Sequence, residues 1–88
     1  MTRRYVLCGR VQGVGFRYFT QQTAARLRVK GWVRNNPDGT VEVVAQADSE
    51  TLDEFKSHLN QGPRFSEVDS IREEEGPEKD FQLFTIER

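Results

Sequence analysis

The sequence has little of the chemistry that supports disulfides or metal clusters. Its 88 residues include one cysteine, Cys8, and one histidine, His58. These exclude an internal disulfide framework and a Cys- or His-rich metal site. No apolar run approaches the ~20 residues that a membrane-spanning helix needs, and the basic N-terminus lacks the apolar stretch of a signal peptide. We therefore expect a cytoplasmic protein whose chemistry comes from arginine, amide, hydroxyl, carboxylate or backbone groups.

The length and composition are typical of one small globular domain. The chain is 35% hydrophobic and 31% charged, with a formal net charge of -1. A chain of this size buries roughly 60–70% of the surface that its unfolded form exposes, which allows one core. We expect a single domain over residues 1–88, and neither a disordered tail nor a broadly basic nucleic-acid binder.

Acidic residues are missing from the first part of the chain. Between Met1 and Pro37 there are eight basic residues and no Asp or Glu, whereas five basic and fourteen acidic residues follow from Asp38. An acid-free segment spares a bound anion from like-charge repulsion, which makes this part a candidate anion site. Alternatively, the two halves pair with each other across the fold. Composition alone leaves both interpretations open.

Hydrophobic spacing predicts the elements of the first half. The β-branched and aromatic content of Arg3–Arg10 indicates a buried strand. Apolar or small residues recur at helical spacing from Phe16, which predicts a helix from about Arg17 to Arg28. A strand should then begin near Gly31, and turn residues at 36–39 should connect it to an alternating strand over Thr40–Gln46.

Capping residues and apolar spacing in the second half predict one more helix and two more strands. Ser49 is the expected N-cap, and Gly62 ends the helix. Its apolar stripe comprises Leu52, Phe55 and Leu59. Further strands are expected around Val68–Ile71 and over Phe81–Ile86, with the glutamates at 73–75 solvated. This order predicts an α+β split β-α-β sandwich, an antiparallel sheet of four to five strands with both helices on one face.

Several other side chains are assigned to structural roles. Cys8, Trp32 and the six phenylalanines are expected in the core. His58 lies off the apolar stripe of its helix and should face solvent.

Three glycines, Gly9, Gly13 and Gly15, fall where the first strand becomes the first helix. Glycine there lets backbone amides point into one concavity beside the positive helix N-terminus, which favours an anion. The spacing matches neither a Walker loop nor a dinucleotide fingerprint. A tight turn required by packing is the alternative interpretation. Arg17 strengthens the anion interpretation, because a guanidinium in the first helical turn can hold two phosphate oxygens.

Two segments resemble the signatures of the acylphosphatase family. Gly9–Arg17 is similar to the first signature, and Gly31–Asn35 followed by Asp38–Val41 is similar to the second. The resemblance covers nearly the full chain. It implies a ferredoxin-like sandwich and hydrolysis of the carboxyl-phosphate bond of acyl phosphates without metal or cofactor.

The resemblance also implies roles for individual residues. Arg17 and Asn35 correspond to the catalytic arginine and asparagine, the latter positioning a water for in-line attack. The phosphate-binding residues, chiefly through backbone amides, would be Gln12, Gly13, Val14, Gly15 and Phe16, together with the Arg17 side chain. Gly15 departs from many animal relatives, which have a bulkier residue there, and resembles bacterial-type members. The effect of this departure on loop stiffness and substrate range stays open.

Two other functions compete with this interpretation. RNA-recognition domains share the element order but need exposed aromatics on central strands, and Thr40–Gln46 has none. A non-catalytic ligand-sensing or assembly module is the second alternative, which retention of both Arg17 and Asn35 disfavours. We expect a monomer that acts on a small-molecule acyl phosphate and binds neither nucleic acid nor membrane.

Overall fold

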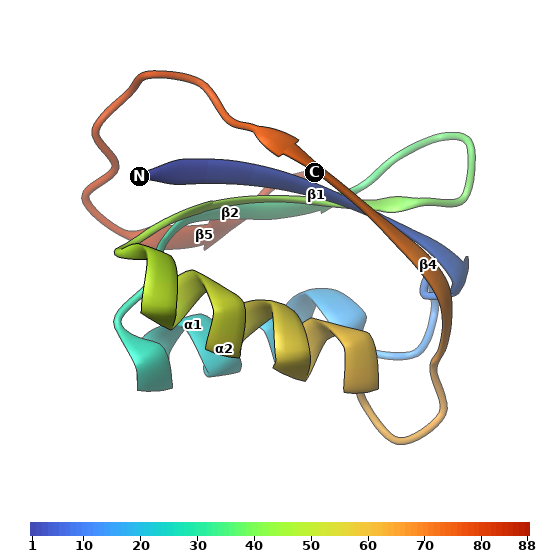
Figure 1. Cartoon of the computed structure of the whole chain (residues 1–88). Helices are drawn as coiled ribbons and strands as arrows, with labels where there is room; N and C mark the ends of the chain where they lie inside the picture. Colours follow the sequence, from blue (N-terminus) through green and yellow to red (C-terminus); the bar gives the residue numbers. More distant parts are fainter.

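The computed structural model describes residues 1–88 and arranges them as a sheet with two helices on one face (Figure 1). In chain order the elements are β1 (Thr2–Arg10), α1 (Phe16–Leu27), β2 (Lys30–Asn35), β3 (Val41–Gln46), α2 (Ser49–Gln61), β4 (Glu67–Glu75) and β5 (Phe84–Ile86). The α+β sandwich predicted from the sequence is confirmed. Neither helix has the length and apolar character needed to cross a bilayer.

The sheet has five strands in the order β4-β1-β3-β2-β5. The pairs β1-β3, β1-β4 and β2-β3 are antiparallel, as predicted. The prediction of a wholly antiparallel sheet is wrong for β5, which pairs parallel with β2 and places Ile86 opposite Val33. The reason is that β4 and β5 lie at opposite edges, so the chain crosses the end of the sheet instead of turning back in a hairpin (Figure 1).

Gln46 at the end of β3 holds the segment that crosses from β4 to β5. Its Nε2 donates to the carbonyl of Lys79 at 2.6 Å, and its Oε1 accepts from the amide of Phe81 at 3.1 Å. After β5, the amide of Glu87 donates to the carbonyl of Val33 at 2.8 Å. The C-terminal residues therefore run beside the last residues of β2.

The second helix begins one residue earlier than expected, because Asp48 and not Ser49 is its N-cap. Asp48 has extended backbone angles, and its Oδ1 accepts from the amide of Thr51 at 2.8 Å. That backbone hydrogen bond lowers the pKa of Asp48 below its usual value. Ser49 takes the first helical position instead.

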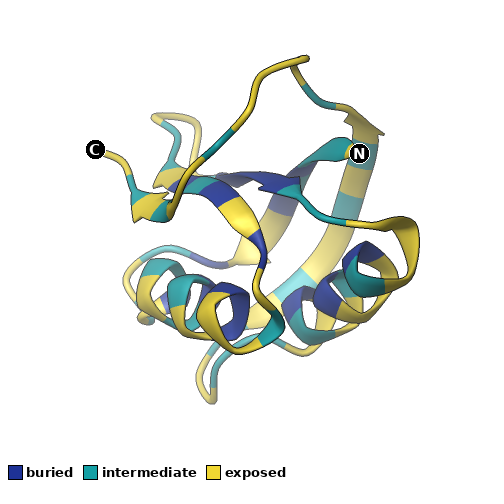
Figure 2. Ribbon diagram, turned by 90° about the vertical axis from the view of Figure 1, so that its left-hand side faces the viewer, coloured by how far each residue is buried: buried dark blue, intermediate teal, exposed yellow.

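The core lies between the sheet and the helices, where dark blue segments of both face one another in Figure 2. It contains Tyr5, Leu7, Val11, Phe16, Ala24, Val29, Val33, Val41, Val43, Ala45, Leu52, Phe55 and Leu59. The predicted stripe of α2 is part of it. Burial raises the pKa of Tyr5 to about 12, and its hydroxyl donates to the carbonyl of Leu52 at 3.5 Å. The sheet and α2 are thus joined by a polar contact inside an apolar layer.

The expectation that Cys8, Trp32 and the six phenylalanines lie in the core is wrong at four positions. Phe81 is half-buried in the segment that crosses to β5 and lies outside the core cluster. Cys8 is exposed, because Tyr5 and Leu7 point toward the helices and alternation along β1 sends Cys8 to the uncovered face. Trp32 lies half-buried, with the guanidinium of Arg34 at 5.1 Å from its ring centre. Phe65 is 71% exposed in the turn between α2 and β4.

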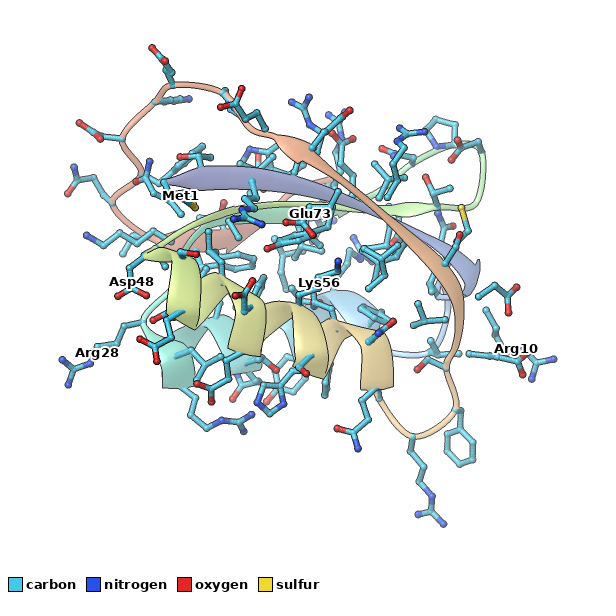
Figure 3. All side chains as sticks on the ribbon, in the orientation of Figure 1. Met1, Arg10, Arg28, Asp48, Lys56 and Glu73 are labelled. Carbon is cyan, nitrogen blue, oxygen red and sulfur yellow. The ribbon has the colours of Figure 1, made fainter.

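The glutamates at 73–75 are strand residues, and the expectation of a solvated run is wrong for Glu73. It accepts hydrogen bonds from Lys56 of α2 at 2.8 Å and from Arg3 of β1 (Figure 3). Lys56 first, and then Arg3, hold the pKa of Glu73 below its usual value. This carboxylate therefore joins β1, β4 and α2.

We predict that Glu73→Gln destabilises the fold at neutral pH by about 1–2 kcal/mol, because two cations lose their shared charged acceptor. The folded-state pKa is lowered, so the stabilisation is present above the unfolded pKa near 4.5 and is lost as pH falls through the folded value. Urea unfolding of both proteins at pH 7 and below pH 4 measures the difference, which should shrink in acid.

Glu78→Gln is the matched control, because Glu78 is exposed and forms no ion pair. Its stability should equal that of the wild type at both pH values. Equal stability of Glu73→Gln and the wild type at pH 7 would contradict the prediction.

Candidate active site

The segment between β1 and α1 is shaped by two glycines in left-handed conformations. Gly13 has φ 75° and Gly15 has φ 80°. A Cβ added to either would meet nothing within 4 Å, so crowding does not require glycine here. The backbone conformation does, because side chains disfavour positive φ.

The amides of this loop have no acceptor within the protein. Residues 12–15 donate no backbone hydrogen bond, and the first residues of α1 have no partner inside the helix. Gly15 is the N-cap and has no side chain to occupy these amides, and the first turn contains no acidic residue. The loop therefore presents free donors at the positive end of a 12-residue helix.

Arg17, the second residue of α1, lies half-buried beside this loop. It faces the same cavity as Gly13 and Gly15 and forms no ion pair with a carboxylate. A guanidinium next to free amides supplies the fork that binds two oxygens of a tetrahedral anion.

Asn35 reaches the same cavity from the end of β2, where it is paired with Val41 of β3. Its Oδ1 is buried and has no hydrogen-bond partner. An unsatisfied buried acceptor costs about 1–3 kcal/mol, so its presence calls for an explanation.

The cavity has a volume of about 580 Å³. It is lined by Val11, Gly13, Gly15, Phe16, Arg17, Tyr18, Asn35, Ile86 and Arg88. No lining side chain is a carboxylate, thiol or imidazole, which leaves a site suited to an anion.

The structure brings most of the expected site residues to this cavity. Arg17, Asn35, Gly13, Gly15 and Phe16 line it, whereas Gln12 and Val14 do not. The sequence did not indicate Tyr18, Ile86 or Arg88 as part of the site. Tyr18 could have been found from its position next to Arg17, but the other two are brought in only by the parallel pairing of β5 with β2.

Gln12 has a structural role through its side chain. Its Nε2 donates to the carbonyls of Asn36 and Thr40, each at 2.8 Å. These carbonyls belong to the turn that follows Asn35. The side-chain amide of Gln12 thereby connects the glycine loop to the segment that carries Asn35.

The turn itself is closed by its own side chains. Asn36 Nδ2 donates to Thr40 Oγ1 at 3.0 Å, and Thr40 Oγ1 donates to Asp38 Oδ1 at 2.7 Å. The hydroxyl of Thr40, followed by its backbone amide, lowers the pKa of Asp38. Thr40 therefore braces the turn after Asn35.

The pairing interpretation of the charge asymmetry holds for part of the chain, and the anion-site interpretation stays a prediction for the rest. Arg3 pairs with Glu73, and Arg4 pairs with Glu42 and Glu74. Arg34 pairs with Glu42 as well. The other five basic residues of the acid-free segment form no ion pair: Arg10, Arg17, Arg26, Arg28 and Lys30. Figure 3 shows Arg10 pointing away from the ribbon. Of these five, only Arg17 lines the cavity.

A larger hollow of about 990 Å³ lies near the N-terminus. Its lining contains Glu73, Glu74, Glu75, Glu78 and Asp80. Carboxylates of this number repel an anion, so the smaller cavity is the candidate active site. Nowhere does the structure gather three His, Cys, Asp or Glu side chains as metal ligands.

Comparison with known proteins gives the family of this chain. The family model Acylphosphatase matches residues 3–86. Acylphosphatase from Koribacter versatilis is 47% identical, covering 98% of this chain and 79% of the relative, and that from Petrotoga mobilis is 45% identical, covering 97% and 96%. The crystal structure of acylphosphatase from Bacillus subtilis has 38% identity and a TM-score of 0.94, covering 99% of this chain and 98% of that one. The resemblance of the two motifs is thereby confirmed: the chain belongs to the acylphosphatase family.

Proposed function

We propose that this chain hydrolyses acyl phosphates to a carboxylate and inorganic phosphate in the cavity between the glycine loop and the end of β2. The bond between the carboxyl oxygen and phosphorus breaks, and a water oxygen forms the new bond to phosphorus. Carboxylate is a good leaving group, so positioning and charge stabilisation supply the catalysis. Neither a metal nor a cofactor is part of the proposal.

The phosphoryl group would bind at the start of α1. Amides of Gly13, Gly15 and Phe16 and the fork of Arg17, all of which line the cavity, would surround the oxygens on which negative charge gathers in a loose transition state. These donors have no other partner, so they need little reorganisation when the charge develops. Arg17 would be the catalytic cation.

Asn35 would position the attacking water. Its carboxamide is a weak base but offers an acceptor and donors. Oδ1 would accept one hydrogen of the water and hold its oxygen in line with the bond that breaks. The second proton would pass to a phosphate oxygen of the substrate, because no lining side chain is a stronger base.

One observation carries this proposal: Arg17, Asn35 and the glycines of the loop, whose amides have no partner within the protein, line one cavity. The alternative is a non-catalytic ligand-sensing or assembly module. That alternative is not favoured, because the relatives that cover nearly the whole chain are acylphosphatases.

We also propose that residues 1–88 act as one monomeric, cytoplasmic domain that binds neither nucleic acid nor membrane. One cluster of 13 buried residues draws on β1, β2, β3 and both helices. On the uncovered face of the sheet, Glu42 is only 9% exposed and pairs with Arg4 and Arg34, which neutralises charges that a phosphate backbone would need.

Sedimentation equilibrium should give the mass of one chain at all concentrations; a stable dimer would contradict the monomer.

The activity is tested by following benzoyl phosphate hydrolysis in the ultraviolet with EDTA present. The wild type should turn over, and Arg17→Lys should lose roughly 10²–10³-fold in kcat/KM, because a point charge cannot replace the fork. Arg26→Lys is the matched control, since Arg26 lies exposed on the same helix without an ion pair. No turnover by the wild type would overturn the activity, and near-wild-type constants for Arg17→Lys would remove Arg17 from the mechanism.

Asn35→Ala should lower kcat by roughly 10²–10³-fold while inorganic phosphate inhibits as well as before, because Asn35 acts on the water. Its melting temperature should equal or exceed that of the wild type, since the substitution removes an unsatisfied buried oxygen. Asn60→Ala on the exposed side of α2 serves as the control and should keep the kcat and the melting temperature of the wild type. Turnover retained in Asn35→Ala would show that this residue does not position the water.

A further inference from the structure

The cavity is larger than the phosphoryl group requires. A phosphate has five heavy atoms and needs roughly 150 Å³ at the ~30 Å³ that one water takes up in the liquid. The cavity holds about 580 Å³. Space therefore remains next to the glycine loop for the part of the substrate that leaves.

This outer space has an apolar wall made by two residues. Among the apolar lining residues, Val11 and Phe16 are 1% and 2% exposed and belong to the core. Tyr18 is 64% exposed, and Ile86 is half-buried. Only Tyr18 and Ile86 offer appreciable apolar surface that a ligand can touch.

The two residues reach the cavity from different elements. Tyr18 follows Arg17 in the first turn of α1, and its side chain forms no hydrogen bond with the protein. Ile86 comes from β5, where it is paired with Val33 of β2. The acyl group of a substrate held by Arg17 would therefore meet a tyrosine ring on one side and an aliphatic side chain on another.

We propose that Tyr18 and Ile86 form the acyl-group subsite, and that they select acyl phosphates with an aromatic or bulky apolar acyl group over acetyl phosphate. This inference rests on the proposed function. Tyrosine suits such a subsite because an aromatic ring stacks on or packs edge-on against another ring. No acidic side chain lines the cavity to oppose the anionic part of the substrate.

Arg88 also lines the cavity, but its charge does not discriminate among acyl groups. Every acyl phosphate carries the same charged phosphoryl group, so a second guanidinium would strengthen binding of all of them alike. Specificity for the acyl group is therefore assigned to the apolar wall.

The test compares kcat/KM for benzoyl phosphate and acetyl phosphate. Tyr18→Ala should lower the benzoyl-to-acetyl ratio by about 2- to 10-fold, which is the contribution of one aromatic pair. Tyr18→Phe should keep the ratio, because the ring and not the hydroxyl makes the contact. Inhibition by inorganic phosphate should stay unchanged in both variants, which a general disturbance of the loop would not allow.

Two further variants are controls. Phe65→Ala removes an exposed aromatic ring outside the cavity and should leave both rates unchanged. Arg88→Ala should change both substrates by the same factor. A wild-type ratio in Tyr18→Ala, or a ratio that shifts only in Arg88→Ala, would overturn the subsite while leaving the hydrolase intact. Failure of the wild type on both substrates would overturn the proposed function as well.

Discussion

The side-chain amide of Gln12 joins the two segments from which the site is built. Its hydrogen bonds to the carbonyls of Asn36 and Thr40 span 24 and 28 residues of sequence. Each bond contributes only about 1 kcal/mol to stability. Their importance lies in position, because they hold the glycine loop against the turn that follows Asn35. The glycines of the loop and Asn35 consequently line one cavity.

Charge in this protein is divided between stability and ligand binding. Glu42 and Glu73 each form ion pairs with two basic side chains. The pairs of Glu42 connect neighbouring strands, and those of Glu73 connect β4 to β1 and to α2. Arg17 is left without such a partner in a cavity that has no acidic lining. A carboxylate beside Arg17 would satisfy its charge and compete with a bound phosphate. The absence of acidic residues before Asp38 prevents that competition from sequence neighbours.

The site also departs from the rules that the rest of the fold follows. Helix α2 has a side-chain cap in Asp48, whereas α1 begins at a glycine that leaves its amides open. Buried polar atoms are normally bonded, whereas Asn35 Oδ1 is not. Both departures reduce stability locally, and both belong to residues that line the cavity. Such local conflicts are expected where a structure is shaped for a ligand.

The succession of strands and helices along the chain, the apolar stripe of α2 and the glycine loop could be predicted from the sequence, because alternation, helical spacing and turn chemistry act over a few residues. Its two motifs also identified the family. Only the tertiary structure decided that β5 runs parallel to β2, that Cys8 faces away from the helices, and that Ile86 and Arg88 reach the cavity of Arg17. These outcomes depend on which strands pair and which face the helices cover. Such choices are made by contacts between residues far apart in the chain, and no local pattern encodes them.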